Sequence, residues 1–185
     1  EDKLRFKEKF CFFSQKRTKG KLIWFHGASV GEIMSIIPLI SKYEKDNNIK
    51  NILITSSTVS SSRIIEKFKF KKVTHQFFPI DHIFLTNKFL EYWKPDIAIF
   101  LESEIWPMMF VSIKKHNIPL ILLNARITKK SFNKWFKLKN FSKSIFSLID
   151  YAYPQNIETS YFLKKLDLKK IKFIGNLKFI DYEKK

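Results

Sequence analysis

The stretch from residue 94 to residue 125 reads KPDIAIFLESEIWPMMFVSIKKHNIPLILLNA and decides the fold. Residues 94–102 and 118–125 contain runs that are apolar at every position, as expected for strands buried on both faces of a sheet. Between them, residues 106–117 have a helical pattern with Pro107 in the first turn, where proline is tolerated. A strand, a helix and a second strand in this order are typical of a parallel α/β sheet.

The same alternation extends over the rest of the chain. Short apolar runs predict further strands at residues 21–26, 51–58, 72–80, 151–156 and 170–175. Helical spacing predicts helices at residues 33–45, 61–68, 84–93 and 157–167, and one long helix at 131–149. Seven strands separated by helices predict an α/β fold with a doubly wound, Rossmann-like parallel sheet covered by helices on both faces.

The composition narrows the class of protein. The chain has 185 residues, of which 45% are hydrophobic, so it is long and apolar enough for a substantial core. Cys11 is the single cysteine, which excludes an internal disulfide and fits a reducing compartment. One cysteine and four histidines do not favour a structural zinc site, and we expect no metal and no cofactor. No apolar run reaches the ~18 residues of a membrane span.

The chain divides into a basic, aromatic lead-in at residues 1–19 and one domain at residues 20–181. Because the sequence begins with Glu1 and ends in the charged stub DYEKK, we expect it to be a piece of a longer protein.

The net charge is +18, from 35 Lys and Arg against 17 Asp and Glu. Such a surplus attracts nucleic acid, an anionic membrane or phosphorylated substrates. The abundance of Lys, Asn, Ile and Phe fits an AT-rich genome equally well, so the charge decides nothing by itself. Residues 131–146 interleave aromatic side chains with lysines, which suits either an interfacial helix or a core helix with a basic, solvated face.

Ligands of an open α/β sheet bind at the carboxyl ends of the strands, so the loops there are the candidates. The first is GASVGE, residues 27–32. Spacing alone favours a capping box, in which Ser29 caps a helix and Glu32 reaches back to the backbone N–H of the cap. The chemical alternative makes Glu32 a base in a cleft, with Gly31 leaving room for a substrate. The loop is neither GxGxxG nor a P-loop, which argues against dinucleotide and ATP binding.

Three later loops carry further polar groups. ESEIWP, residues 102–107, places Glu102 and Glu104 after an apolar strand, where they are either an acidic pair in the first turn of a helix or part of a site. Arg126, in NARITKKS, either binds phosphate or carboxylate or pairs with a glutamate of the previous loop. Lys178, in GNLKF, points either to the cleft or into water.

Together HGASVGE, ESEIWP, NARIT and GNLKF resemble, in order and spacing, the N-terminal half of 3-deoxy-D-manno-octulosonic acid (Kdo) transferases, over residues 20 to 181. The resemblance implies the N-terminal, acceptor-side half of a two-domain GT-B glycosyltransferase that moves Kdo from CMP-Kdo to a lipid A precursor without a metal. It also implies action at the cytoplasmic face of the bacterial inner membrane, with a membrane anchor before this region and a second, donor-binding domain after it. The isolated 185-residue chain is therefore expected to be inactive.

Matching positions carry the roles that the resemblance implies. Glu32 falls on the family's general base, and Glu102 matches a second functional carboxylate. Ser29, Gly31, Glu104, Arg126 and Lys178 are the expected substrate-binding residues. The chain departs from the family at Met108, where Asn is usual, and at Thr128, where Ser is common.

The expected partners are a lipid A precursor, CMP-Kdo and an anionic membrane surface, and no nucleic acid. Two alternatives stay open: a polyanion-binding or nucleic-acid-binding α/β domain, and a GT-B enzyme that uses another sugar nucleotide. Paired carboxylates at the mouth of a cleft argue against the first, because they would repel a nucleic acid.

Overall fold

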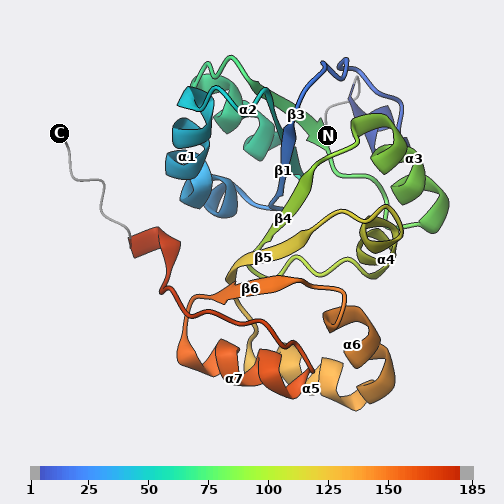
Figure 1. Ribbon diagram of the computed structural model, residues 1–185, viewed down its shortest axis with the longest axis vertical. Helices are drawn as coiled ribbons and strands as arrows, with labels where there is room; N and C mark the ends of the chain where they lie inside the picture. Colours follow the sequence, from blue (N-terminus) through green and yellow to red (C-terminus); the bar gives the residue numbers. More distant parts are fainter. Residues whose placement is uncertain (1–4, 180–185) are drawn as a thin grey trace.

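The computed structural model describes residues 5–179, which form a single six-stranded sheet with helices on both faces (Figure 1). The strands are β1 (Leu22–His26), β2 (Asn51–Ser56), β3 (Val73–Phe77), β4 (Ile97–Leu101), β5 (Leu120–Ala125) and β6 (Tyr151–Pro154). The helices are α1 (Val30–Lys45), α2 (Val59–Lys67), α3 (Ile83–Trp93), α4 (Pro107–Lys115), α5 (Lys129–Lys137), α6 (Lys139–Phe146) and α7 (Ile157–Lys165), with 3₁₀ turns η1 (Phe6–Phe10) and η2 (Leu177–Phe179).

The strand order is β3-β2-β1-β4-β5-β6, and every neighbouring pair is parallel. The order reverses between β1 and β4, so the predicted doubly wound, Rossmann-like sheet is confirmed. At this reversal His26 lies beside Thr55 of β2 and Phe100 of β4 in the register. The crevice outside the carboxyl ends of β1 and β4 is where such a sheet binds ligands.

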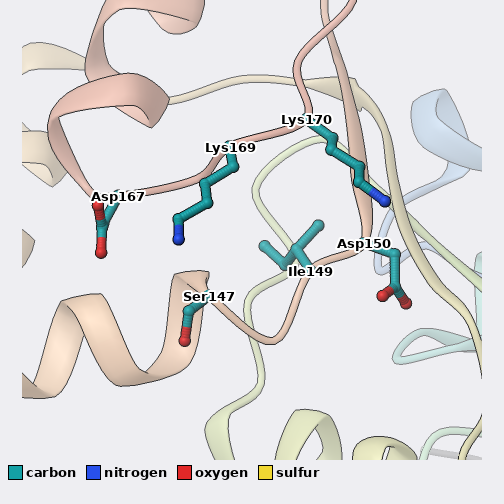
Figure 2. A pocket seen from close by; sticks show the side chains of 6 residues that line it. All are labelled: Ser147, Ile149, Asp150, Asp167, Lys169 and Lys170. Atoms are coloured by element: carbon teal, nitrogen blue, oxygen red, sulfur yellow. The ribbon is translucent and has the colours of Figure 1, made fainter.

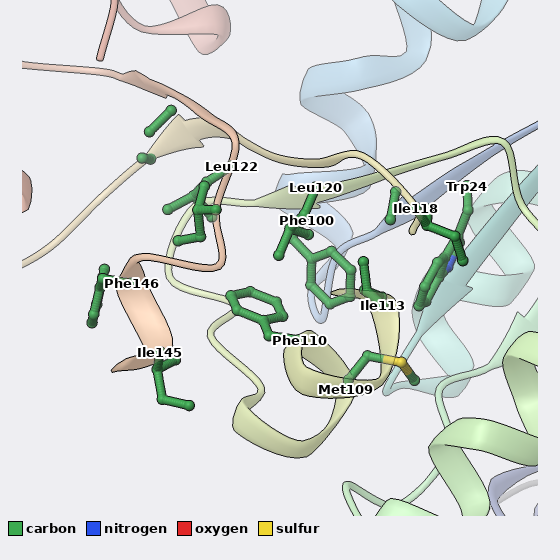
Figure 3. Packing of buried hydrophobic residues seen from close by; sticks show 14 of the residues in the cluster. Trp24, Phe100, Met109, Phe110, Ile113, Ile118, Leu120, Leu122, Ile145 and Phe146 are labelled. Atoms are coloured by element: carbon green, nitrogen blue, oxygen red, sulfur yellow. The ribbon is translucent and has the colours of Figure 1, made fainter. Parts of the chain in front are cut away.

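Both faces of the sheet are buried, which explains why its strands read as continuous apolar runs. Successive side chains of β1 point to opposite faces: Trp24 joins one core cluster and Phe25 the other. The cluster on the Phe25 face is completed by isoleucines of α1 and α2. The cluster on the Trp24 face is larger and aromatic, and it includes Phe100, Met109 and Phe110 packed together in Figure 3.

Two predicted elements differ from the structure. The seventh strand, 170–175, is absent: Ile171 makes one isolated parallel bridge to Ala152, and the residues after it form no ladder. The long helix predicted at 131–149 is broken at Leu138, whose ψ of 46° is not helical. The break redirects the chain so that α6 buries Ile145 and Phe146 in the aromatic cluster.

The lead-in packs against the sheet along β3 and α3. The buried Glu8 carboxylate accepts hydrogen bonds from the guanidinium of Arg5 at 2.8 Å and from the backbone N–H of Phe77 at 2.9 Å. Cys11 is buried in the aromatic cluster, and the ring of Phe13 stacks on that of Tyr92. The outer ends of the two expected segments, residues 1–4 and 180–181, lie outside the described part of the chain.

Candidate active site at the carboxyl edge of the sheet

The β1–α1 turn holds Glu32 by two hydrogen bonds. Ser29 is the N-cap of α1, and its hydroxyl oxygen accepts from the backbone N–H of Glu32. In return, Glu32 Oε1 accepts from the hydroxyl of Ser29 at 2.8 Å, and Oε2 accepts from the backbone N–H of Ala28 at 2.8 Å. The expected bond to the N–H of the cap itself is therefore wrong by one residue, because the carboxylate bonds to the N–H of Ala28. The turn caps the helix and fixes the carboxylate at the same time.

Glu32 has a pKa raised above the ordinary value of a glutamate. Partial burial is the main cause, and the charges of Glu104 and Glu102 add to it. The hydrogen bonds from Ser29 and Ala28 act in the opposite direction without cancelling the burial effect. A raised pKa suits a general base, because a carboxylate with higher proton affinity removes a proton more readily.

The ESEIWP segment forms a turn between β4 and α4. The first-turn interpretation of its glutamates is wrong, because α4 begins at Pro107 and has no acidic residue in its first turn. Asp81 supplies the capping carboxylate from the loop after β3: it accepts from the backbone N–H of Met108 at 3.2 Å and of Met109 at 2.7 Å. Glu102 and Glu104 therefore do not cap α4, and they lie at the carboxyl edge of the sheet.

Glu102 is buried and has a left-handed backbone, with φ of 49°. Its backbone is held in place on both sides, since its N–H donates to Leu123 O and its C=O accepts from the N–H of Arg126. Its side chain reaches Lys178, whose Nζ lies 2.6 Å from Oε1. This ion pair is formed because Asn124 Oδ1 accepts from the backbone N–H of Leu177 and ties η2 to the end of β5. Lys178 therefore points to the cleft.

Glu104 is held from the opposite side. Its Oε2 lies 3.1 Å from Nε2 of the buried His26 and 2.9 Å from Nε1 of Trp106. Burial by itself would raise the pKa of Glu104, but the hydrogen bond and charge of His26 and the hydrogen bond from Trp106 outweigh it and leave the pKa lowered. His26 lies in the HGASVGE motif, and its role in holding Glu104 could not be predicted from the sequence. A polar residue that ends an otherwise apolar strand was the available signal.

The remaining predicted residues lie at the rim. Gly31 is exposed, and a Cβ added there would find only Lys178 Nζ, at 4.0 Å. Arg126 follows β5 with its side chain exposed, and no ion pair joins it to another residue in the described range 5–179. Pairing with a glutamate of the previous loop is therefore not observed. Thr128, one of the departures from the family, caps α5 by accepting from the N–H of Ser131.

The hollow drawn in Figure 2 lies away from these residues. It is lined by Ser147, Ile149, Asp150, Asp167, Lys169 and Lys170, around the segment that leads into β6. Asp150 already has structural partners there, accepting from Lys114 Nζ and from the backbone N–H of Leu120. Because this is the amino end of the sheet, the hollow is separate from the cleft where ligands of this fold bind.

Among residues 5–179, no group of three His, Cys, Asp or Glu side chains is arranged to hold a metal ion. In the same range no helix combines the length and the apolar character needed to cross a bilayer.

The sheet and its edge define a Rossmann-like α/β domain with a carboxylate-lined ligand edge. UDP-GlcNAc 2-epimerase from Neisseria meningitidis, bound to UDP-GlcNAc, has the same fold, with a TM-score of 0.61 and 15% identity over 86% of this chain and 47% of that one. The enzyme of the same name from Rickettsia bellii gives a TM-score of 0.58 at 16% identity over 86% of this chain and 46% of that one. At these identities the likeness concerns the fold alone.

Sequence comparison identifies the family of the chain. The sequence model of the family described as 3-deoxy-D-manno-octulosonic-acid transferase (kdotransferase) matches residues 4–180. The 3-deoxy-D-manno-octulosonic acid transferase of Rickettsia bellii is 37% identical over 97% of this chain and 43% of its own length. That of Haemophilus influenzae is 28% identical over 85% of this chain and 37% of its own length. The chain belongs to the Kdo transferase family and spans less than half the length of these relatives.

Proposed function

We propose that this chain is the acceptor-side domain of a glycosyltransferase that moves Kdo from CMP-Kdo to a lipid A precursor in lipopolysaccharide biosynthesis. The observation that carries the proposal is the Glu32 carboxylate, which is held by two hydrogen bonds at the carboxyl edge of the sheet. Membership of the Kdo transferase family supports the choice of substrates. The activity belongs to a longer protein, and we expect residues 1–185 by themselves not to turn over CMP-Kdo.

In the proposed reaction, Glu32 takes the proton from a hydroxyl of the acceptor sugar. The hydroxyl oxygen forms a bond to the anomeric carbon of Kdo, while the bond from that carbon to the phosphate oxygen of CMP breaks and CMP leaves with the electron pair. A carboxylate with a raised pKa suits this step, since it is a stronger base and is still ionised when its pKa lies below the working pH. Ser29 orients the base, and Gly31 leaves space beside it.

The basic groups near Glu32 fit anionic substrates. Lys178 is held over Glu102 and borders Gly31, so its ammonium group is positioned for a phosphate or carboxylate of a substrate. Arg126 presents a planar guanidinium at the rim, which suits bidentate binding of the same groups. Glu102 limits the net positive charge of this cluster.

The membrane association expected from the family has a candidate surface on α5 and α6. Phe136, Leu138 and Phe141 are between 44% and 58% exposed, and exposed lysines surround them at positions 134, 137, 139 and 143. This basic aromatic surface combines apolar side chains with charges that attract anionic lipids. We propose that it lies on the cytoplasmic face of the bacterial inner membrane, where phosphorylated lipid acceptors are found.

The test uses the full-length transferase that contains this domain, incubated with a lipid A precursor and CMP-Kdo, with product mass measured by mass spectrometry. The proposal expects an acceptor heavier by one or more Kdo units. Parallel reactions with UDP-linked sugars and with a CMP-linked sugar other than Kdo address the alternative donor. Transfer from one of these and not from CMP-Kdo would contradict the assignment of the donor, and transfer from none would contradict the assignment of the activity.

A further inference from the structure

His26 ends β1 in an environment that fixes its ring completely. The side chain is 0% exposed, and its ring stacks on that of Phe78 at 3.8 Å between centroids. Both ring nitrogens have polar neighbours: Nδ1 lies 3.0 Å from Thr55 Oγ1, and Nε2 lies 3.1 Å from Glu104 Oε2. A histidine held in this way can orient the carboxylate to which its Nε2–H donates, which is that of Glu104.

The hydrogen-bond partners place a hydrogen on Nε2 of this ring. Burial lowers the pKa of His26, while the hydrogen bond and charge of Glu104 and the backbone C=O of Thr55 act in the opposite direction. Nε2 faces a carboxylate oxygen and must carry the hydrogen, because two acceptors at that distance would repel each other. Nδ1 lies near two oxygens of Thr55, 3.0 Å from Oγ1 and 3.2 Å from the carbonyl O, and the donation from Nε2 to Glu104 does not depend on whether Nδ1 also carries a hydrogen.

The carboxylate of Glu104 is thereby fixed through one oxygen. Oε2 receives the N–H of His26 and the N–H of Trp106. No residue in the described part of the chain donates a hydrogen bond to Oε1, and the side chain of Glu104 is 15% exposed. Glu104 lies close enough to Glu32 for its charge to act on that residue. The carboxylates of Glu104 and Glu32 therefore belong to the same site.

We propose that His26 is a positioning residue of the transferase: with Trp106 it clamps Oε2 of Glu104 so that Oε1 accepts a hydrogen bond from the acceptor sugar next to Glu32. This inference rests on the proposed function and specifies which hydrogen bonds hold the acceptor. His26 itself touches neither substrate, and its effect on the reaction passes through Glu104.

Two substitutions of His26 separate the hydrogen bond from the rest of the side chain. In His26→Gln the amide nitrogen extends about as far as Nε2 and can donate to Glu104. In His26→Asn the shorter side chain places its amide near Nδ1 and does not reach. The full-length enzyme with CMP-Kdo and a lipid A precursor is the system, and the KM of each substrate and kcat are measured separately.

We expect His26→Asn to raise the KM of the acceptor roughly tenfold and to lower kcat/KM, while the KM of CMP-Kdo changes less than about twofold. His26→Gln should recover most of this loss. Trp106→Phe removes the other donor without altering the buried histidine, and it should shift the acceptor KM in the same direction. The effects of His26→Asn and Glu104→Gln should not add, because both act on one hydrogen bond.

His75→Gln is the matched control, since His75 is a second buried histidine in the sheet that bonds to Arg5 and Ser56 and not to the site. Equal losses for the Asn and Gln variants at position 26, or an unchanged acceptor KM in both His26→Asn and Trp106→Phe, would overturn the inference. Should His26→Asn fail to fold, His26→Gln and Trp106→Phe still decide the question. A wild-type enzyme that transfers nothing from CMP-Kdo would instead count against the proposed function.

Discussion

Lys178 places its ammonium nitrogen 2.6 Å from Oε1 of Glu102, joining the end of the described chain to the edge of β4. Glu102 Oε1 is buried and, among residues 5–179, has no hydrogen-bond partner apart from this contact. The pair therefore both closes the site and holds η2 against the sheet. Removing the lysine leaves a buried carboxylate oxygen without compensation, which costs more than the net value of a solvent-exposed pair.

The substitution Lys178→Met should lower the free energy of unfolding by about 1–3 kcal/mol, the usual cost of an unsatisfied buried polar group. Urea denaturation followed by circular dichroism measures it. Lys129→Met, at an exposed lysine, is the control and should change stability by less than about 0.5 kcal/mol. The double variant Glu102→Gln/Lys178→Met should lose less than the sum of the single losses. Equal stability of the Lys178 and Lys129 variants would show that the pair contributes nothing.

Much of the sheet could be predicted because buried parallel strands leave an apolar signature, and six of the seven predicted strands are present. The seventh predicted strand, at 170–175, is not formed. A strand needs a neighbour along its whole length, and in this segment only Ile171 pairs with one. The break in the helix at Leu138 could not be predicted from the sequence either, since the pattern of aromatic residues and lysines continues across it. Tertiary packing of Ile145 and Phe146 decides where the chain turns.

The site was predictable as a set of loops and not as a set of contacts. The motifs at the strand ends identified Glu32, Glu102 and Glu104, because parallel strands bring their carboxyl ends to one edge. Their partners depend on distant segments. Lys178 reaches Glu102 only because Asn124 holds the backbone of Leu177. Such pairings follow from the folded backbone, about which local spacing carries no information.

Asp81 offers a test of a capping interaction that joins two loops. Its carboxylate accepts from the backbone N–H groups of Met108 and Met109 at the start of α4. Asp81→Ala should lower the free energy of unfolding by about 1–2 kcal/mol, the usual cost of a lost helix cap. Thermal melts measure the change, with the exposed Glu91→Ala on α3 as the control. A melting temperature that matches the control would mean that water satisfies these N–H groups equally well.

The basic aromatic surface on α5 and α6 predicts binding that depends on charge. Vesicles containing anionic lipid should bind the protein more tightly than neutral vesicles, and the affinity should fall as salt is raised. Replacing Lys134 and Lys137 by Gln should weaken this binding several-fold for each lysine, since each charge contributes about 1 kcal/mol near such a surface. Co-sedimentation with vesicles at low and high salt is the measurement.

The matched control replaces Lys42 and Lys45, two exposed lysines in the last turn of α1, by Gln. This variant has the same net charge as the Lys134/Lys137 variant but keeps the surface on α5 and α6. Equal weakening by both pairs would show that total charge, and not this surface, directs binding. Equal affinity of the wild type for neutral and anionic vesicles would remove the electrostatic basis altogether.

Glu32 gives the most direct test of the proposed reaction. Glu32→Gln keeps the size of the side chain and an oxygen that can accept from the N–H of Ala28, but an amide cannot take up a proton at working pH. In the full-length enzyme kcat should fall by roughly 10²–10⁴-fold, the usual effect of losing a general base, while folding stays nearly intact. Ser29→Ala should do the reverse, with a loss of about 1 kcal/mol of stability and a smaller change in kcat.

The raised pKa of Glu32 also fixes the direction of two pH effects. The base acts when ionised, so kcat/KM should decline on acidification through a pKa above the ordinary value of a glutamate. Because the folded-state pKa exceeds that of the unfolded chain, this group adds stability at pH values below the unfolded pKa and loses that contribution as the pH rises through the folded pKa. The stability of Glu32→Gln relative to wild type should therefore rise as the pH increases from the unfolded to the folded pKa, and it should stay higher above the folded pKa. Wild-type turnover by Glu32→Gln would leave the turn with a capping role only, and Glu102→Gln and Glu104→Gln would then be the variants in which to look for the base.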